Sequence, residues 1–177
     1  METKFNTKEN QTMGRELLIL CLNTSTAEAP VWSPVGKRVS DSTMSYDWKK
    51  ETSTDVLGNT HNSLSKPQIT QTFDPWQLDA ADKAQKLIWD NGIKDQNPDA
   101  LASLDALVIH KYAGTATTAM FAERYNSCAV TPTSLGGAGG GKLAMPIEVT
   151  FGGERTVGTA AVENGAFTFT PEAPAEG

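Results

Sequence analysis

The residues most typical of a reactive site form a glycine-rich segment that ends in a lysine. Residues 136–142 follow the spacing G-x-x-x-x-G-K, the first part of a phosphate-binding loop. Such a loop also needs Ser or Thr next, to hold the metal, and a helix after it. Here Leu143 follows, and an alternating pattern typical of a strand comes after it. The sequence therefore favours a flexible surface loop, whose glycines would let neighbouring subunits approach closely.

Histidine and cysteine chemistry has weak support. His61 lies in a polar segment and His110 in a predicted strand, and neither has a second ligand at metal-binding spacing. Cys21 and Cys128 lie in predicted strands far apart in the sequence. We expect two buried free thiols, while a disulfide or a Cys–His pair assembled by the fold stays open as an alternative.

Three aspartates, Asp74, Asp79 and Asp82, cluster where a helix is predicted to begin. Helix capping and the helix dipole explain them better than a calcium or acid–base site, because the EF-hand pattern is absent. No nucleophile–base pair or metal-ligand set emerges elsewhere. We therefore expect no enzyme, no cofactor and no bound metal.

The tryptophans offer a different kind of site, an aromatic platform for sugars. They are Trp32, Trp48, Trp76 and Trp89. Three of the four occupy positions that periodicity would bury, so packing in the core is the favoured interpretation.

Composition limits the class of protein. The chain has 177 residues and a mass of 18.9 kDa, which fits one domain, and 38% of its residues are hydrophobic. Its net charge is −6 and its basic residues are scattered, whereas proteins that grip phosphates cluster them on one face. No apolar run approaches the ~20 residues that span a bilayer, and the polar N-terminus lacks the apolar segment of a signal peptide. We expect a soluble chain made in the cytoplasm, with no membrane partner and no tight hold on nucleic acid.

A long hairpin at residues 42–74 dominates the predicted fold. Both of its strands alternate apolar and polar residues, as a half-buried strand does, and a polar segment at 51–66 supplies turn chemistry between them. A long loop without catalytic residues is typical of a contact with another chain. The apolar positions predicted to lie in the core are Met44, Tyr46, Trp48, Ile69 and Phe73. On that placement, truncating Trp48 to alanine would cost about 3–5 kcal/mol.

The other predicted elements are mostly strands. They cover residues 16–23, 31–39, 104–112, 118–130, 143–151 and 154–162, with a last strand around Phe167 and Phe169. Asn164-Gly165 is the strongest signal for a two-residue hairpin turn. One helix is expected at about residues 80–91, with Asp79 as its N-cap and Gly92 just after its end.

These elements predict a mainly β fold. Two packed antiparallel sheets, as a β-sandwich or barrel, would carry one flanking α-helix and the long β-hairpin loop. The domain would cover residues 16–171, between an N-terminal arm at 1–15 and a C-terminal tail at 172–177.

Several stretches, in their order and spacing, resemble the major tail tube proteins of long-tailed bacteriophages, the siphophage-type tail tube family. They are D-x-L-G-N-T at residues 55–60, F-D-P at 73–75, FAERYNSCAV at 121–130 and MPIEVTFGGERTVGT at 145–159. The resemblance implies two packed sheets with one helix in each subunit, and six subunits in a ring. Sheets of neighbouring subunits would join into a β-barrel around a bore, and rings would stack through the hairpin loop and terminal arms.

The resemblance also implies a role and partners. The chain would be a structural virion protein of the phage tail, and DNA would pass through the bore at ejection. Expected partners are further copies of itself, a tape measure protein and DNA in the lumen, and tail tip and tail terminator proteins. With a charge of −6 on each chain, a bore lined with carboxylates would repel phosphates within roughly 8 Å. DNA would then be enclosed without being held.

Two strand faces of the hairpin are expected to line the bore, although a one-residue change of register would exchange them with the core faces. The expected bore-lining residues are Thr43, Ser45, Asp47, Lys49, Gln68, Thr70, Thr72 and Asp74. The expected inter-ring contacts in the hairpin loop are Glu51, Asp55, Leu57, Asn59, His61 and Asn62.

Two other functions stay open. The inner tube of a contractile tail or injection system would have the same fold, and the sequence does not show whether a sheath surrounds the tube. A monomeric carbohydrate-binding or adhesin-like β-sandwich would instead use the tryptophans.

Overall fold

The structure is mainly β, as the sequence predicts. The computed structural model describes residues 4–6, 10–115 and 118–173. The strands are β1 (Leu18–Asn23), β2 (Trp32–Val35), β3 (Met44–Asp47), β4 (Lys50–Thr54), β5 (Thr60–Leu64), β6 (Gln68–Phe73), β7 (Leu104–Thr115), β8 (Ala119–Pro132), β9 (Ile147–Thr150), β10 (Arg155–Glu163) and β11 (Ala166–Pro171). The helical elements are short: the 3-10 turn η1 (Arg15–Leu17), α1 (Lys83–Ile88), the π-helix η2 (Trp89–Lys94) and α2 (Pro98–Leu101). None of these described helices is long and apolar enough to cross a membrane.

Six antiparallel strands form a small barrel. Their pairings run from β1 through β2, β11, β10, β8 and β7 back to β1. Only Trp32 and Phe167 pair across β2 and β11 among the described residues, so the barrel closes weakly there. Asn164 and Gly165, with φ of 50° and 79°, make the predicted turn between β10 and β11. The barrel interior is filled by Cys21, Trp32, Leu107, Ile109, Met120, Ala122 and Ala160.

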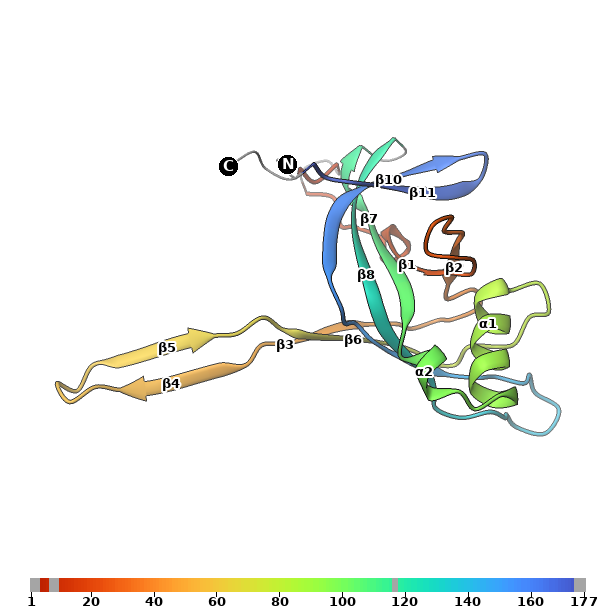
Figure 1. Cartoon of the computed structure of the whole chain (residues 1–177), viewed down its shortest axis with the longest axis horizontal. Coiled ribbons are helices and arrows are strands. Elements are labelled where there is room, and N and C mark those ends of the chain that lie inside the picture. The colour runs from red at the N-terminus through yellow and green to blue at the C-terminus, as the bar shows by residue number, and fades with distance from the viewer. Residues whose placement is uncertain (1–3, 7–9, 116–117, 174–177) are drawn as a thin grey trace.

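A second antiparallel sheet grows from the far end of β8. The first part of this long strand pairs with β7 and β10 in the barrel, and residues 129–132 pair with β9. β9 pairs with β6, and β6 with β3, which is the edge strand. Beyond it, β4 and β5 pair with each other and extend the hairpin far from the body, on the side away from α1 (Figure 1). The predicted long hairpin is confirmed, but residues 51–66 contain an ordered two-stranded ladder instead of a broad loop.

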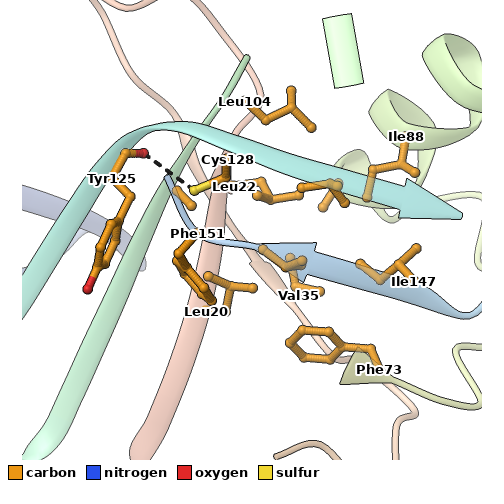
Figure 2. Packing of buried hydrophobic residues seen from close by; sticks show 14 of the residues in the cluster. Leu20, Leu22, Val35, Phe73, Ile88, Leu104, Tyr125, Cys128, Ile147 and Phe151 are labelled. Carbon is orange, nitrogen blue, oxygen red and sulfur yellow. Dashed lines mark hydrogen bonds between the residues drawn. The ribbon is translucent and has the colours of Figure 1, made fainter. Parts of the chain in front are cut away.

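The larger core lies where the barrel, the second sheet and the helix meet. Figure 2 shows Leu22 of β1, Cys128 of β8, Ile147 of β9 and Ile88 of α1 converging on it. Phe73 of β6 is buried there, as predicted. Because β8 belongs to both the barrel and the second sheet, this core fixes the second sheet against the barrel.

The helix differs from the prediction at both ends. Asp82 is the N-cap, not Asp79: its backbone is extended, and its side chain accepts hydrogen bonds from the amides of Ala84 and Gln85 at 3.0 and 3.1 Å. Asp79 instead pairs with Lys37 at 2.8 Å. The helical chain also continues through Gly92, as the π-helix η2, and the short helix α2 follows it outside the elements predicted from the sequence.

The described part of the N-terminal arm lies against the barrel. Phe5 forms a bridge with Ala113, and the Asn6 amide donates to the Tyr112 carbonyl at 2.9 Å. Residues 1–3 and 7–9 of the arm, and residues 174–177 of the predicted tail, lie outside the described residues. The domain boundaries therefore stay a prediction.

Candidate assembly surface

The register of β3 and β6 brings the two predicted bore-lining strand faces together. Ser45 pairs with Thr70, and Asp47 pairs with Gln68. Directly opposite residues of an antiparallel pair point to the same face, so these four side chains share one side of the sheet. The two faces predicted separately from the sequence are a single surface.

This polar face continues across β9 to the end of β8. Thr70 pairs with Thr150, and Thr72 pairs with Glu148. Glu148 in turn pairs with Thr131 of β8. We name the surface formed by Ser45, Asp47, Gln68, Thr70, Thr72, Thr131, Glu148 and Thr150 the polar sheet face. Its members on β8 and β9 were missed by sequence reasoning, although the alternation of residues 143–151 contains the signal: the apolar positions there leave Glu148 and Thr150 on the other side.

The remaining predicted bore-lining residues flank this face. Lys49 follows β3, and its Nζ donates to an Asp47 carboxylate oxygen at 2.8 Å. Thr43 and Asp74 are exposed just beyond the ends of the β3–β6 ladder. The polar sheet face and the residues beside it carry three carboxylates, Asp47, Asp74 and Glu148, and one lysine, Lys49. This surface is therefore acidic.

Two predicted core residues prove to be exposed. Tyr46 and Trp48 alternate with the polar residues as expected, but their side chains are 46% and 54% exposed. The physical reason is that β3 is the edge strand: Phe73 on β6 lies over the core, whereas the hairpin at Trp48 has already left the body. The prediction that Trp48→Ala removes a core side chain, at a cost of about 3–5 kcal/mol, is therefore wrong for the isolated chain.

Tyr46 and Trp48 border a groove between the hairpin base and the barrel. Its volume is about 660 Å³. Apart from two glycines, its other lining residues are Pro67, Ile69, Tyr125 and Phe151 and the charged residues Lys66, Glu123, Glu154 and Arg155. We name this hollow the aromatic groove.

A buried polar cluster joins β7, β8 and β10 beside the groove. The Glu123 carboxylate accepts hydrogen bonds from Tyr125 Oη at 2.6 Å and Arg155 Nε at 3.1 Å, and His110 Nε2 lies 3.3 Å from its other oxygen. His110 Nδ1 is 2.6 Å from Tyr112 Oη. Burial alone would raise the pKa of Glu123, but His110, Arg155 and Tyr125 outweigh it and lower the pKa to about 2. Sequence reasoning missed this cluster because its members come together only through strand pairing.

The hairpin tip is a hydrogen-bonded turn built around Asp55. One Asp55 oxygen accepts from the amides of Leu57 and Asn59, both at 2.9 Å, and the other lies 3.0 Å from His61 Nε2. Hydrogen bonds from His61 and Asn59 lower the pKa of Asp55 to about 2. The turn leaves Val56 and Leu57 outside, at 103% and 83% exposure.

The other predicted inter-ring residues lie on the ladder below this turn. Glu51 is on β4 and pairs with Ser63. Asn62 is on β5, where its side chain accepts from the Thr52 hydroxyl at 2.8 Å. The predicted inter-ring set therefore belongs to one ordered element.

The residues considered for chemistry are dispersed. Cys21 and Cys128 are free and buried, as predicted, and burial raises the pKa of both thiols. Residues 136–142 form a loop that β9 follows, not a helix. Trp32 and Trp76 are buried, so the four tryptophans form no shared platform. Within the described residues no three metal-binding side chains cluster.

Comparisons with known proteins support the architecture. No family model and no curated protein matches the sequence. A chain from the cryo-EM structure of an extracellular contractile injection system, the PVC sheath/tube terminator in its extended state, aligns with a TM-score of 0.53 and 8% identity, covering 85% of this chain and 99% of its own. A chain from the anti-feeding prophage cap, the AFP tube terminating cap, aligns with a TM-score of 0.50 and 13% identity, covering 88% and 96%. At such identities the likeness establishes a shared fold.

Proposed function

We propose that this chain is a structural subunit of a phage-type tail tube. The observation that carries the proposal is the polar sheet face, which ends at the edge strand β3 and continues into a hairpin that projects from the body (Figure 1). An exposed strand edge is a site for pairing with another chain. The two exposed aliphatic side chains at the hairpin tip, Val56 and Leu57, also support a contact with another chain.

Each feature has a role in such a tube. Six copies joined edge to edge would form a ring, with the polar sheet face towards the bore. Hairpin tips would reach between stacked rings and bury Val56 and Leu57. The bore would contain the tape measure protein before ejection and DNA during it, and tail tip and terminator proteins would close the ends.

The acidic residues on and beside the polar sheet face support passage without adhesion. Asp47, Asp74 and Glu148 would be repeated in every subunit, and carboxylates repel phosphates at short range. We infer that the lumen encloses DNA without binding it.

A second candidate is a tube component of a contractile system, either its inner tube or its terminator. The shared fold with the two chains from contractile injection particles favours it. Such a subunit would assemble in the same way but would also bind a sheath or cap protein on its outer surface.

Electron microscopy of the purified chain at increasing concentration tests the proposal. We expect rings or hollow tubes whose wall is one subunit thick. A chain that stays monomeric at every concentration and salt, also with a tail-tip complex added as initiator, would contradict it. Co-assembly with a sheath protein encoded nearby would favour the contractile candidate.

A further inference from the structure

The aromatic groove presents a conflict between pattern and burial. Tyr46 and Trp48 occupy the strand face that periodicity predicts to be buried, and the register with β6 places Tyr46 on the side opposite the polar sheet face. Yet about half of each side chain is exposed. Large aromatic side chains contribute most to the free energy of association when they are removed from water, and tryptophan and tyrosine are enriched at the centres of protein interfaces.

Tyr46 lies on a strand with one open edge, and Trp48 follows that strand directly. Among the described residues β3 pairs only with β6, so the backbone groups on its other edge are open to a further strand. A strand added there would lie about 4.8 Å from β3. Its side chains on the groove side would then stand beside Tyr46 and Trp48. A single neighbouring strand would therefore form hydrogen bonds with the open edge of β3 and also cover the rings of Tyr46 and Trp48.

We propose that the aromatic groove is the apolar centre of a subunit interface, covered by a second copy of this chain that extends the sheet at β3. The proposal rests on the tail-tube function proposed above and identifies which side chains supply the contact. A second copy suits the site because its own strands alternate polar and apolar faces. It can continue the polar sheet face on one side while it presents apolar side chains to Trp48 on the other.

The groove also matches a strand of this kind chemically. Four charged residues line it beside the aromatic and aliphatic ones: Glu123 accepts a hydrogen bond from Arg155 at 3.1 Å, whereas Lys66 and Glu154 are exposed. An incoming apolar strand face that leaves Lys66 and Glu154 in solvent would therefore bury no unpaired charge, which is the costly outcome at an interface.

Hydroxyl-radical footprinting of the wild-type chain, as monomers and as assembled tubes, tests this directly. Trp48 and Tyr46 should be oxidised several-fold more slowly in tubes than in monomers. Trp89, which is 37% exposed on η2, reports the reactivity of a tryptophan outside the groove. Equal oxidation of Trp48 in tubes and monomers would overturn the proposal while leaving the tube function intact. A chain that never self-associates would overturn both.

Substitution gives a second measurement that does not depend on probe chemistry. Trp48→Ala should raise the critical concentration for tube formation by at least about tenfold, while the melting temperature of the monomer changes little. The matched variant Trp89→Ala should leave assembly close to wild type. Assembly of Trp48→Ala at the wild-type concentration would overturn the proposal.

Discussion

Ser45 of β3 lies directly opposite Thr70 of β6, so that both side chains point to one face of the sheet. This pair defines the register of the hairpin base. A slip of one residue would move the polar side chains to the core side and Tyr46 to the outer face. Thr70 in turn pairs with Thr150 of β9, which extends the same polar surface towards β8.

Placing lysines on the polar sheet face should make the tube retain DNA. Thr72 and Glu148 are exposed and lie opposite each other on β6 and β9. The double variant Thr72→Lys with Glu148→Lys would reverse the sign of the charge on this ring from acidic to basic, and a basic surface releases counterions on binding phosphate. We expect duplex DNA present during assembly to cosediment with variant tubes, and to dissociate steeply as salt increases.

The control for this experiment is Glu163→Lys, which reverses a charge on an exposed residue of β10, outside the polar sheet face. These tubes should retain no more DNA than wild type. If both variants retain DNA equally, the polar sheet face does not line the lumen.

Loss of the Asp55 carboxylate should loosen the hairpin tip without unfolding the body. In Asp55→Ala the amides of Leu57 and Asn59 lose their acceptor. Hydrogen exchange at these amides should therefore accelerate at neutral pH, while β7 and β8 exchange as before. Glu51→Gln, on the same hairpin, is the matched control and should leave the tip protected.

The same turn should open at low pH in the wild-type chain. The folded pKa of Asp55 is about 2, below the ordinary aspartate value of about 3.9. A depressed pKa means that the carboxylate stabilises the turn fully above the ordinary value and loses this effect as pH falls through about 2. Tip exchange, corrected for intrinsic rates, should rise over that window. A tip that stays equally protected at pH 2 would show that Asp55 does not hold it.

Truncation of two tryptophans should separate the core from the surface. Trp76 is fully buried in the larger core, so Trp76→Ala should lower the free energy of unfolding by about 3–5 kcal/mol. Trp48→Ala should cost less than about 1 kcal/mol in the monomer, because the side chain is half exposed there. Denaturant unfolding of both variants at a concentration below assembly measures the difference. Equal losses of unfolding free energy in the two variants would mean that Trp48 is part of the core.

The sequence predicts the faces of the hairpin well and its burial poorly. Alternation is a local property, so spacing alone assigns Ser45, Asp47, Thr70 and Thr72 to polar faces. How far the body reaches beneath β3 depends on strand order, which no local pattern contains. Spacing therefore places Trp48 in the core, although the sheet ends before reaching it.

The helix start shows a similar limit. Asp79 and Asp82 are both good N-cap residues three positions apart, and the choice between them depends on Lys37, which is distant in sequence and pairs with Asp79. The Glu123 cluster was not predictable for a related reason. His110 comes from β7 and Arg155 from β10, and only pairing of both strands with β8 brings them to Glu123.

Removing the Glu123 charge should destabilise the barrel wall in a pH-dependent way. Glu123→Gln weakens the hydrogen bonds from Tyr125 and Arg155 and leaves buried groups poorly satisfied, which should cost about 1–3 kcal/mol at neutral pH. Arg155 is half exposed, so solvent screens part of its contribution. Thermal and denaturant unfolding below the assembly concentration measure the loss, and Glu154→Gln, an exposed neighbour with the same charge change, should be close to neutral.

The pH dependence distinguishes a charge effect from a packing effect. The folded pKa of Glu123 is about 2, below the ordinary glutamate value of about 4.3. The carboxylate therefore contributes its full stabilisation above the ordinary value and loses it as pH falls through about 2. The gap in unfolding free energy between wild type and Glu123→Gln should be constant from neutral pH to about pH 5 and should narrow below it. A gap that stays constant down to pH 2 would mean that the variant differs from wild type only in packing at this position, and that the buried charge does not stabilise the junction of β7, β8 and β10.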